Sequence, residues 1–162
     1  KVSAVRQRRP VRPANARDGN GRLVRMLDAN FNRALEGCRV IEDALRLGKR
    51  FGGRAWDPRF SRLRTLRHRL SVLRTRFGIR RLVESRDVHA DPGSFRKALW
   101  ERRYRSYHSM LAANIQRLKE SLRVIEEVGR ALPVRRLFAD AKDLRFQAYA
   151  LEENILSGRK SR

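Results

Sequence analysis

Apolar residues recur every three or four positions through most of the chain, which is the period of an α-helix and not of a β-strand. The segments between the apolar runs are rich in capping and breaking residues: Asp18-Gly19-Asn20-Gly21, Gly52-Gly53, Asp57-Pro58, Gly78 and Pro133. The first of these segments is predicted to form a turn and the third to begin a helix. The pattern as a whole predicts four helices and no strand, with helices over residues 22–50, 58–77, 106–132 and 134–156. Residues 79–85 have room for one or two further helical turns.

One segment of the sequence occurs twice. The pattern A-N-x-x-R-x-x-E-x-x-R-V-I-E-[D/E] fits residues 29–43 and again residues 113–127, which lie 84 positions later. On a helix, the apolar positions of each copy form one stripe, but the polar positions repeat as well. A helix that needed only a core would not repeat its polar positions, so a second surface of each copy is predicted to have a specific role. Ion pairing between helices explains the repeated charges equally well, at about 0.2–0.5 kcal/mol for each exposed pair.

The similarity between the two halves continues beyond this motif at an offset of 78 positions. The corresponding pairs are Phe60 and Phe138, Leu66 and Leu144, Arg67 and Arg145, and Leu73 and Leu151. The repeated unit is therefore a pair of helices. Two helical hairpins that each bury one apolar stripe predict an all-α fold, a four-helix bundle built from two pseudo-symmetric hairpins.

The chain of 162 residues is long enough for one domain with its own core. Residues 1–18 are predicted to be a disordered basic tail, residues 19–157 a single helical domain, and residues 158–162 a second basic tail. Because the sequence begins with Lys1 and not with methionine, we interpret it as part of a longer chain.

The net charge of +23 is extreme for this length and indicates an anionic partner. A general surplus of surface arginine accounts for the charge equally well. Cys38 is the single cysteine, so an internal disulfide is excluded, and its place on an apolar stripe predicts a core residue. A cytoplasmic location is expected. No membrane association is expected, because no apolar run approaches the roughly 18 residues of a membrane span.

The two copies of the motif supply the first candidate site residues. Asn30 and Asn114 lie beside the apolar stripes, where an amide must be hydrogen-bonded, either to a ligand or to another amide or the backbone. Arg33 and Arg117 follow one turn later and can hold phosphate oxygens through a planar fork, or pair with nearby glutamates such as Glu36.

The segment from Arg86 to Ser94 supplies the remaining candidates. Asp87 and Asp91 lie four positions apart in a loop, where two carboxylates can bind Mg²⁺, and Arg86 stands beside them. Capping of the turn at Asp91 explains that residue about as well. The three histidines are isolated, and no glycine-rich phosphate loop is present.

These residues together resemble a known family. The segment from Leu27 to Asp43, Leu66-Arg67-His68, the loop Arg86-Asp87-x-x-x-Asp91-x-Gly93, and the second motif copy are similar, in this order, to a small all-helical domain. That domain is found ahead of thiamine phosphate synthase in some bacteria and is identified as a monofunctional hydroxymethylpyrimidine phosphate kinase. The resemblance covers roughly residues 21–156. The loop departs from the family pattern, because Val88 stands where the family has threonine and Pro92 where it has valine.

The resemblance implies a phosphotransferase of thiamine biosynthesis that uses ATP and Mg²⁺ to convert 4-amino-5-hydroxymethyl-2-methylpyrimidine phosphate to its diphosphate. The resemblance carries over no residue assignment, so the roles that follow are hypotheses drawn from the physical demands of this reaction. Arg33, Arg117 and Arg86 would hold phosphates, and Asn30 and Asn114 the pyrimidine edge. Asp87 or Asp91 would bind metal or act as a base, with Arg86 part of the same catalytic group. Arg39 and Arg123 would contact the nucleotide.

Two other functions remain open on sequence alone. A basic helical module that binds nucleic acid is supported by the net charge and the arginine-rich ends. An inactive structural domain that associates with thiamine phosphate synthase fits the resemblance as well. Both the synthase domain and a second copy of the chain are candidate partners.

Overall fold

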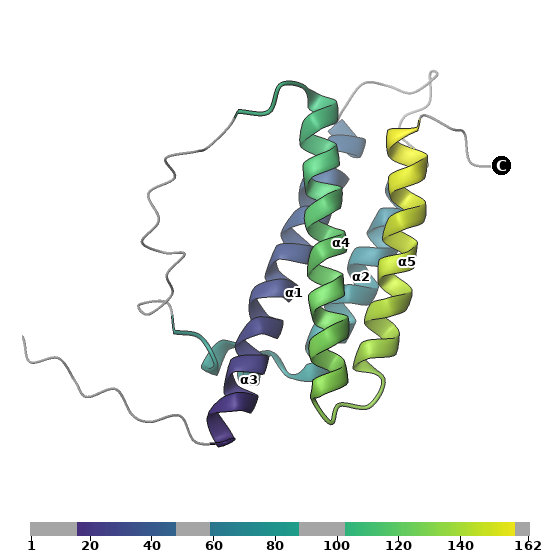
Figure 1. The fold of residues 1–162 in the computed structure, drawn as a ribbon. Coiled ribbons are helices and arrows are strands. Elements are labelled where there is room, and N and C mark those ends of the chain that lie inside the picture. The colour runs from purple at the N-terminus through teal and green to yellow at the C-terminus, as the bar shows by residue number, and fades with distance from the viewer. Residues whose placement is uncertain (1–15, 48–58, 88–102, 158–162) are drawn as a thin grey trace, which may run out of the picture.

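A computed structural model describes residues 16–47, 59–87 and 103–157. The described residues contain five helices and no strand (Figure 1), so the expectation of an all-α fold is confirmed. The helices are α1 (Ala16–Leu47), α2 (Arg59–Phe77), α3 (Ile79–Glu84), α4 (Tyr107–Ala131) and α5 (Leu137–Leu156). None of these helices is long and apolar enough to cross a bilayer, judged over the described residues.

Two predicted helix starts are wrong. Asp18–Gly21 does not form a turn, because α1 begins at Ala16 and runs through this segment. A glycine inside a helix costs only about 1 kcal/mol, which is too little to end a long helix. The last helix begins at Leu137 and not at residue 134, because Arg136 adopts a left-handed backbone conformation with φ 65°. The predicted helix start at Asp57-Pro58 and most of the predicted tails lie outside the described residues.

The four long helices surround one core. α1 packs against α2 and α4, and α5 also packs against α2 and α4, so each long helix has two long neighbours. α3 lies against α1 and α2. The side chains between the helices are mostly apolar. The largest that are fully buried include Phe31, Ile41, Leu66, Leu118 and Ile125. Burial of this apolar surface supplies most of the favourable free energy of folding.

The fold also buries two glutamates, at corresponding positions of the repeated motif. Glu42 of α1 lies 2.5 Å from the Nε atom of Arg67 in α2. Glu126 of α4 accepts a 2.9 Å hydrogen bond from Nε of Arg145 in α5, and a second Arg145 nitrogen lies 2.8 Å away. Each glutamate thus joins a repeated helix to the helix that follows it. A buried carboxylate needs such a partner, because an unpaired charge is costly to remove from water.

The correspondence between the halves fails at the first aromatic pair. Phe60 is buried, with 6% of its surface exposed, whereas Phe138 is 43% exposed. Phe138 stands in the first turn of α5, and the guanidinium of Arg130 lies over its ring at 5.7 Å. The two rings therefore have different surroundings, although each is the second residue of its helix.

Replacing Gly129 with alanine is expected to lower the free energy of unfolding by about 1–3 kcal/mol. A Cβ atom on Gly129 would lie 2.8 Å from the backbone nitrogen of Phe138, and the backbone there cannot rotate away as a side chain can. Chemical denaturation followed by circular dichroism measures the change.

Gly21→Ala is the matched control, because nothing lies within 4 Å of a Cβ atom at Gly21. This variant is expected to gain up to about 1 kcal/mol from its better helix propensity. A Gly129→Ala protein as stable as the wild type would show that α4 and α5 do not approach as closely as described.

Candidate functional site

The two helices that carry the repeated motif pack directly against each other. α1 and α4 run in opposite directions and lie side by side (Figure 1). At Gly37 the backbones come close, since a Cβ atom there would lie 3.1 Å from the carbonyl oxygen of Asn114 and 3.8 Å from the backbone nitrogen of Leu118. Gly37 is therefore level with the stretch of α4 between these two residues. Because the helices are antiparallel, earlier residues of α1 are level with later residues of α4.

This register brings two of the predicted arginines together. Arg33 precedes Gly37 by four residues, one turn along the same side of α1, and is thus level with residues near 118–122 of α4. At a rise of 1.5 Å per residue, Arg33 and Arg117 lie within about 8 Å of each other along the helix axes. Both side chains are exposed, and they stand one turn from Gly37 and next to Leu118, where the two helices meet. The repeated motif therefore contributes one exposed arginine from each helix at a similar level of the α1–α4 contact, which is called the α1–α4 seam below.

The two predicted asparagines are buried but are not brought together. Nδ2 of Asn30 donates to the carbonyl of Met26 at 2.8 Å, and Nδ2 of Asn114 donates to the carbonyl of Met110 at 2.9 Å. Asn30 is level with residues seven or more positions beyond Asn114, which separates the two amides by at least about 10 Å along the axes. Each amide thus bonds its own helix, and a single small ring does not reach both.

Asn114 has a further contact that concerns the site. Its Oδ1 atom lies 3.4 Å from a terminal nitrogen of Arg117, which donates to it. The amide therefore bridges the backbone of α4 and one of the two arginines at the seam. This contact limits the directions in which Arg117 can point.

The loop that follows α3 is tied to α1 by two contacts. Arg86 donates to both carboxylate oxygens of Asp28, at 2.6 and 2.9 Å, and Asp28 is only 4% exposed. Arg25 donates to the backbone carbonyl of Asp87 at 2.8 Å. Two-pronged arginine–carboxylate pairs fix geometry well. The start of the loop is thereby held against the first third of α1.

Sequence reasoning missed Asp28 and Arg25. The repeat gave no signal for Asp28, because the corresponding position of the second copy is Ala112. Asp28 offsets the charge of Arg86, so Arg86 is engaged with the protein and not held ready as an unpaired cation. The available signal was helical spacing, which puts Asp28 on the apolar side with Val24 and Phe31, where a carboxylate requires a cationic partner.

The predicted metal ligands are described only in part. Asp87 is exposed at the end of the described loop segment, whereas Asp91 and its neighbours Val88 and Pro92 lie outside the described residues. Among the residues that the structure describes, no three histidine, cysteine or acidic side chains are grouped to hold a metal ion. Mg²⁺ often needs just one or two carboxylates together with substrate phosphates, and the carboxylate of Asp87 is of the type it prefers.

The arginines predicted to contact the nucleotide are paired along their own helices. Arg39 lies 3.6 Å from Glu42, and Arg123 lies 2.7 Å from Glu127. Six residues separate Arg39 from Arg33, which turns the two side chains about 120° apart around the helix. The structure therefore does not group Arg39 with the arginines at the seam, and the ion-pairing explanation fits its contacts.

Cys38 lies in the core with no exposed surface. Burial raises the pKa of the Cys38 thiol to about 12, although the nearby charge of Arg67 acts in the opposite direction. A thiol with this pKa stays protonated at neutral pH and is not a nucleophile.

The described residues form an all-helical domain in which two packed helices carry the same motif, each with an exposed arginine. An ion pair between Arg86 and Asp28 holds the loop after α3 against one of these helices. The chain belongs to the ThiD2 family, whose model matches residues 25–154.

The chain is also similar to curated proteins named thiamine-phosphate synthase. It is 37% identical over 134 residues to the protein from Thermosynechococcus vestitus and 34% identical over 134 residues to one from Nostoc sp., in each case covering 83% of this chain and 35% of the relative. The relative from Rhodopirellula baltica is 33% identical over 129 residues, covering 79% of this chain and 32% of that protein. The chain spans about a third of the length of these relatives. No solved structure matches it.

Proposed function

We propose that this domain transfers the γ-phosphate of ATP to 4-amino-5-hydroxymethyl-2-methylpyrimidine phosphate, with Mg²⁺, in thiamine biosynthesis. Membership of the ThiD2 family and similarity to proteins named thiamine-phosphate synthase support the pathway. Association with a synthase domain is part of the same proposal, because the chain corresponds to about a third of those relatives.

The proposal includes the origin of the fold. Two pseudo-symmetric helical hairpins, α1–α2 and α4–α5, form a four-helix bundle. The buried pairs Glu42–Arg67 and Glu126–Arg145 support this reading, because each hairpin uses the same motif position to join its two helices. Only the helices that carry the motif, α1 and α4, would then contribute the repeated arginines to a shared site.

The proposal is supported chiefly by Arg33 and Arg117, which are both exposed and lie at similar levels of two packed antiparallel helices. Phosphoryl transfer between two anions requires cationic groups that offset their repulsion and hold them in line. Guanidinium groups suit this task, since they stay charged and bind phosphate oxygens in pairs. Among described residues no carboxylate forms an ion pair with either arginine, so both charges remain available to a ligand.

The reaction needs Mg²⁺ held by the loop aspartates but does not need them as a base. An oxygen of the pyrimidine phosphate attacks the γ-phosphorus, the bond from that phosphorus to the bridging oxygen breaks, and ADP leaves with the electron pair. The attacking oxygen is already largely ionised at neutral pH, because the second pKa of a phosphate monoester is about 6. No general base is therefore needed, and Asp87 and Asp91 are assigned to Mg²⁺, which would neutralise charge on the nucleotide phosphates. Arg86 with Asp28 positions this loop.

An ADP-release assay tests the proposal. Purified protein with ATP and Mg²⁺ is expected to release ADP only when the pyrimidine phosphate is present, and chelation of Mg²⁺ is expected to stop the reaction. Reactions without the pyrimidine phosphate, and with the unphosphorylated pyrimidine alcohol, are the controls. Absence of substrate-dependent ADP with both ATP and GTP would contradict the proposal and favour a structural role beside the synthase.

A further inference from the structure

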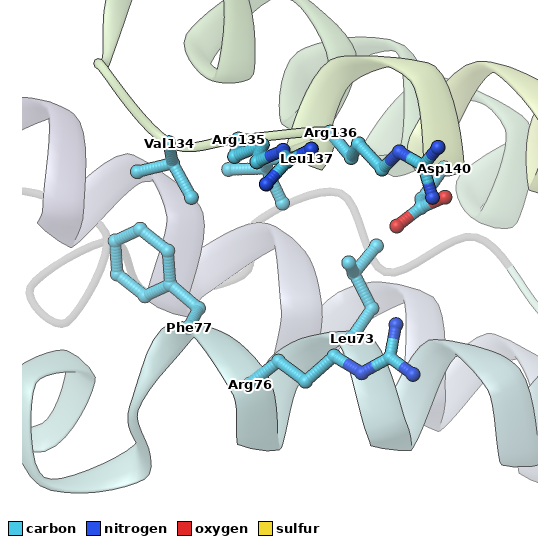
Figure 2. A pocket seen from close by; sticks show the side chains of 8 residues that line it. All are labelled: Leu73, Arg76, Phe77, Val134, Arg135, Arg136, Leu137 and Asp140. Carbon is cyan, nitrogen blue, oxygen red and sulfur yellow. The ribbon is translucent and has the colours of Figure 1, made fainter.

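A cavity of about 420 Å³ lies between the end of α2 and the turn that leads into α5 (Figure 2). This volume is in the range of small-molecule sites, about 300–1,000 Å³. One part of its wall is apolar, and Figure 2 shows Phe77 and Val134 facing each other across it, whereas Leu73 lies toward Asp140. A flat apolar group fits between such side chains.

The other part of the wall is strongly basic. Arg76 of α2 and Arg135 and Arg136 of the turn contribute three guanidinium groups, against one carboxylate, that of Asp140. Figure 2 shows the guanidinium groups of Arg76 and Arg136 near that carboxylate, at the end away from Phe77. Within the described part of the chain, none of the three arginines forms an ion pair. Their positive charges are therefore not neutralised by carboxylates of the described residues.

The backbone at this cavity is unusual. Arg136 has φ 65° and ψ −3°, the left-handed region that residues with a Cβ atom rarely adopt. It is the residue before α5, and the helix start has no side-chain cap. Strained residues of this kind concentrate at ligand sites. Glycine would adopt this conformation without strain, yet the position holds an arginine. The arginine lies beside the N-terminal end of α5, which carries partial positive charge.

A smaller cavity of about 150 Å³ adjoins the first and shares Leu73, Arg76 and Asp140 with it. His68 and Arg69 also line this smaller cavity, and Arg69 forms an ion pair with Asp143 at 2.6 Å. The space available to a ligand therefore continues along the seam between α2 and α5.

From these features, the geometry points to a binding site at the α2–α5 end of the domain for a phosphate monoester that carries a flat apolar ring. The ring lies between Phe77 and Val134, and the phosphate is held by Arg76 and Arg136. Asp140 can accept a hydrogen bond from an amino or hydroxyl group of the ligand. The pyrimidine phosphate of the proposed reaction belongs to this ligand class, but the site shares no residue with the α1–α4 seam, and binding here is tested without any phosphate transfer.

Titration calorimetry with phenyl phosphate tests this site in the absence of ATP. Phenyl phosphate is expected to bind at least tenfold more tightly than inorganic phosphate, and phenol is expected to bind weakly. Arg76→Ala and Arg136→Gly are each expected to weaken phenyl phosphate binding at least tenfold. Arg136→Gly is the more informative variant, because glycine adopts the left-handed conformation freely and the thermal midpoint is expected to stay equal or rise.

Arg64→Ala is the matched control, since Arg64 is an exposed arginine of the same helix outside the cavity and its loss removes the same charge. It is expected to change binding less than twofold. Equal weakening by Arg64→Ala would show diffuse attraction by a basic surface and overturn the site. Three other results would also overturn it. The two cavity variants bind phenyl phosphate as the wild type does, the protein shows no preference for phenyl phosphate over inorganic phosphate, or it binds a short RNA but not phenyl phosphate.

Discussion

Replacing both Arg33 and Arg117 with alanine is expected to lower kcat/KM for the pyrimidine phosphate by at least about 100-fold. A hydrogen bond to a charged group contributes about 1.5–3 kcal/mol, and each 1.36 kcal/mol corresponds to a factor of ten in rate. The loss of one such bond from each arginine therefore gives this factor as a lower limit. Both side chains are exposed at the seam of α1 and α4, so the fold is expected to remain intact. Steady-state kinetics with the ADP-release assay measures the effect.

Single variants at Arg33 and Arg117 are each expected to lose about tenfold or more, because the two groups hold the same anions from opposite helices. Arg64→Ala is again the control for net charge, and its kcat/KM is expected to stay within twofold of the wild type. A double variant that retains the wild-type kcat/KM within threefold would show that Arg33 and Arg117 take no part in the reaction.

Replacing Glu126 with glutamine is expected to lower the free energy of unfolding by about 3 kcal/mol, near the lower end of the cost of breaking a buried ion pair. The carboxylate is fully buried and lies within 2.8 Å of Arg145 and 2.7 Å of Arg130. Glutamine keeps the shape of the side chain but leaves the buried guanidinium of Arg145 without a counter-charge. Urea denaturation followed by circular dichroism measures the change.

Glu127→Gln is the matched control, because Glu127 is the neighbouring glutamate but its side chain is 47% exposed. The expected loss there is at most about 1 kcal/mol. Equal losses at the two positions would show that the buried pair contributes no more than a surface pair.

The same carboxylate predicts a pH dependence. Burial raises the pKa of Glu126, but the hydrogen bonds from Arg130 and Arg145, with the charges of Arg145 and Arg123, outweigh burial and place it below its ordinary value. Because the folded pKa is lowered, the stabilisation is complete above the unfolded pKa of about 4.3 and is lost as the pH falls through the folded pKa. The stability difference between wild type and Glu126→Gln is therefore expected to be constant between pH 5 and pH 7 and to shrink below about pH 4. A difference that grows on acidification would contradict this.

Local periodicity was sufficient to predict the helices, because a 3.6-residue apolar pattern is a property of each segment alone. It also predicted the burial of Cys38, which lies on such a stripe. It failed at Asp18–Gly21, where glycine propensity was given more weight than the continuing helix. The correspondence between the halves failed at Phe138, which is exposed although its counterpart Phe60 is buried.

The candidate site shows a similar division. The repeat predicted a functional surface shared by two helices, and the antiparallel register puts Arg33 and Arg117 at similar levels of these helices. The asparagines were predicted to lie beside the apolar stripes, but their burial and their separation depend on how two distant helices pack. The Arg86–Asp28 pair joins residues 58 positions apart, and a contact of this kind has no local sequence pattern.

Phosphorus NMR of a reaction mixture tests the central claim most directly, because it observes the new bond and not only the release of ADP. The mixture contains the purified chain, ATP, Mg²⁺ and the pyrimidine phosphate. The account predicts that the single resonance of the pyrimidine phosphate is replaced by the two coupled resonances of a diphosphate, in step with conversion of ATP to ADP. An unchanged pyrimidine phosphate resonance, with or without ATP hydrolysis, would contradict it.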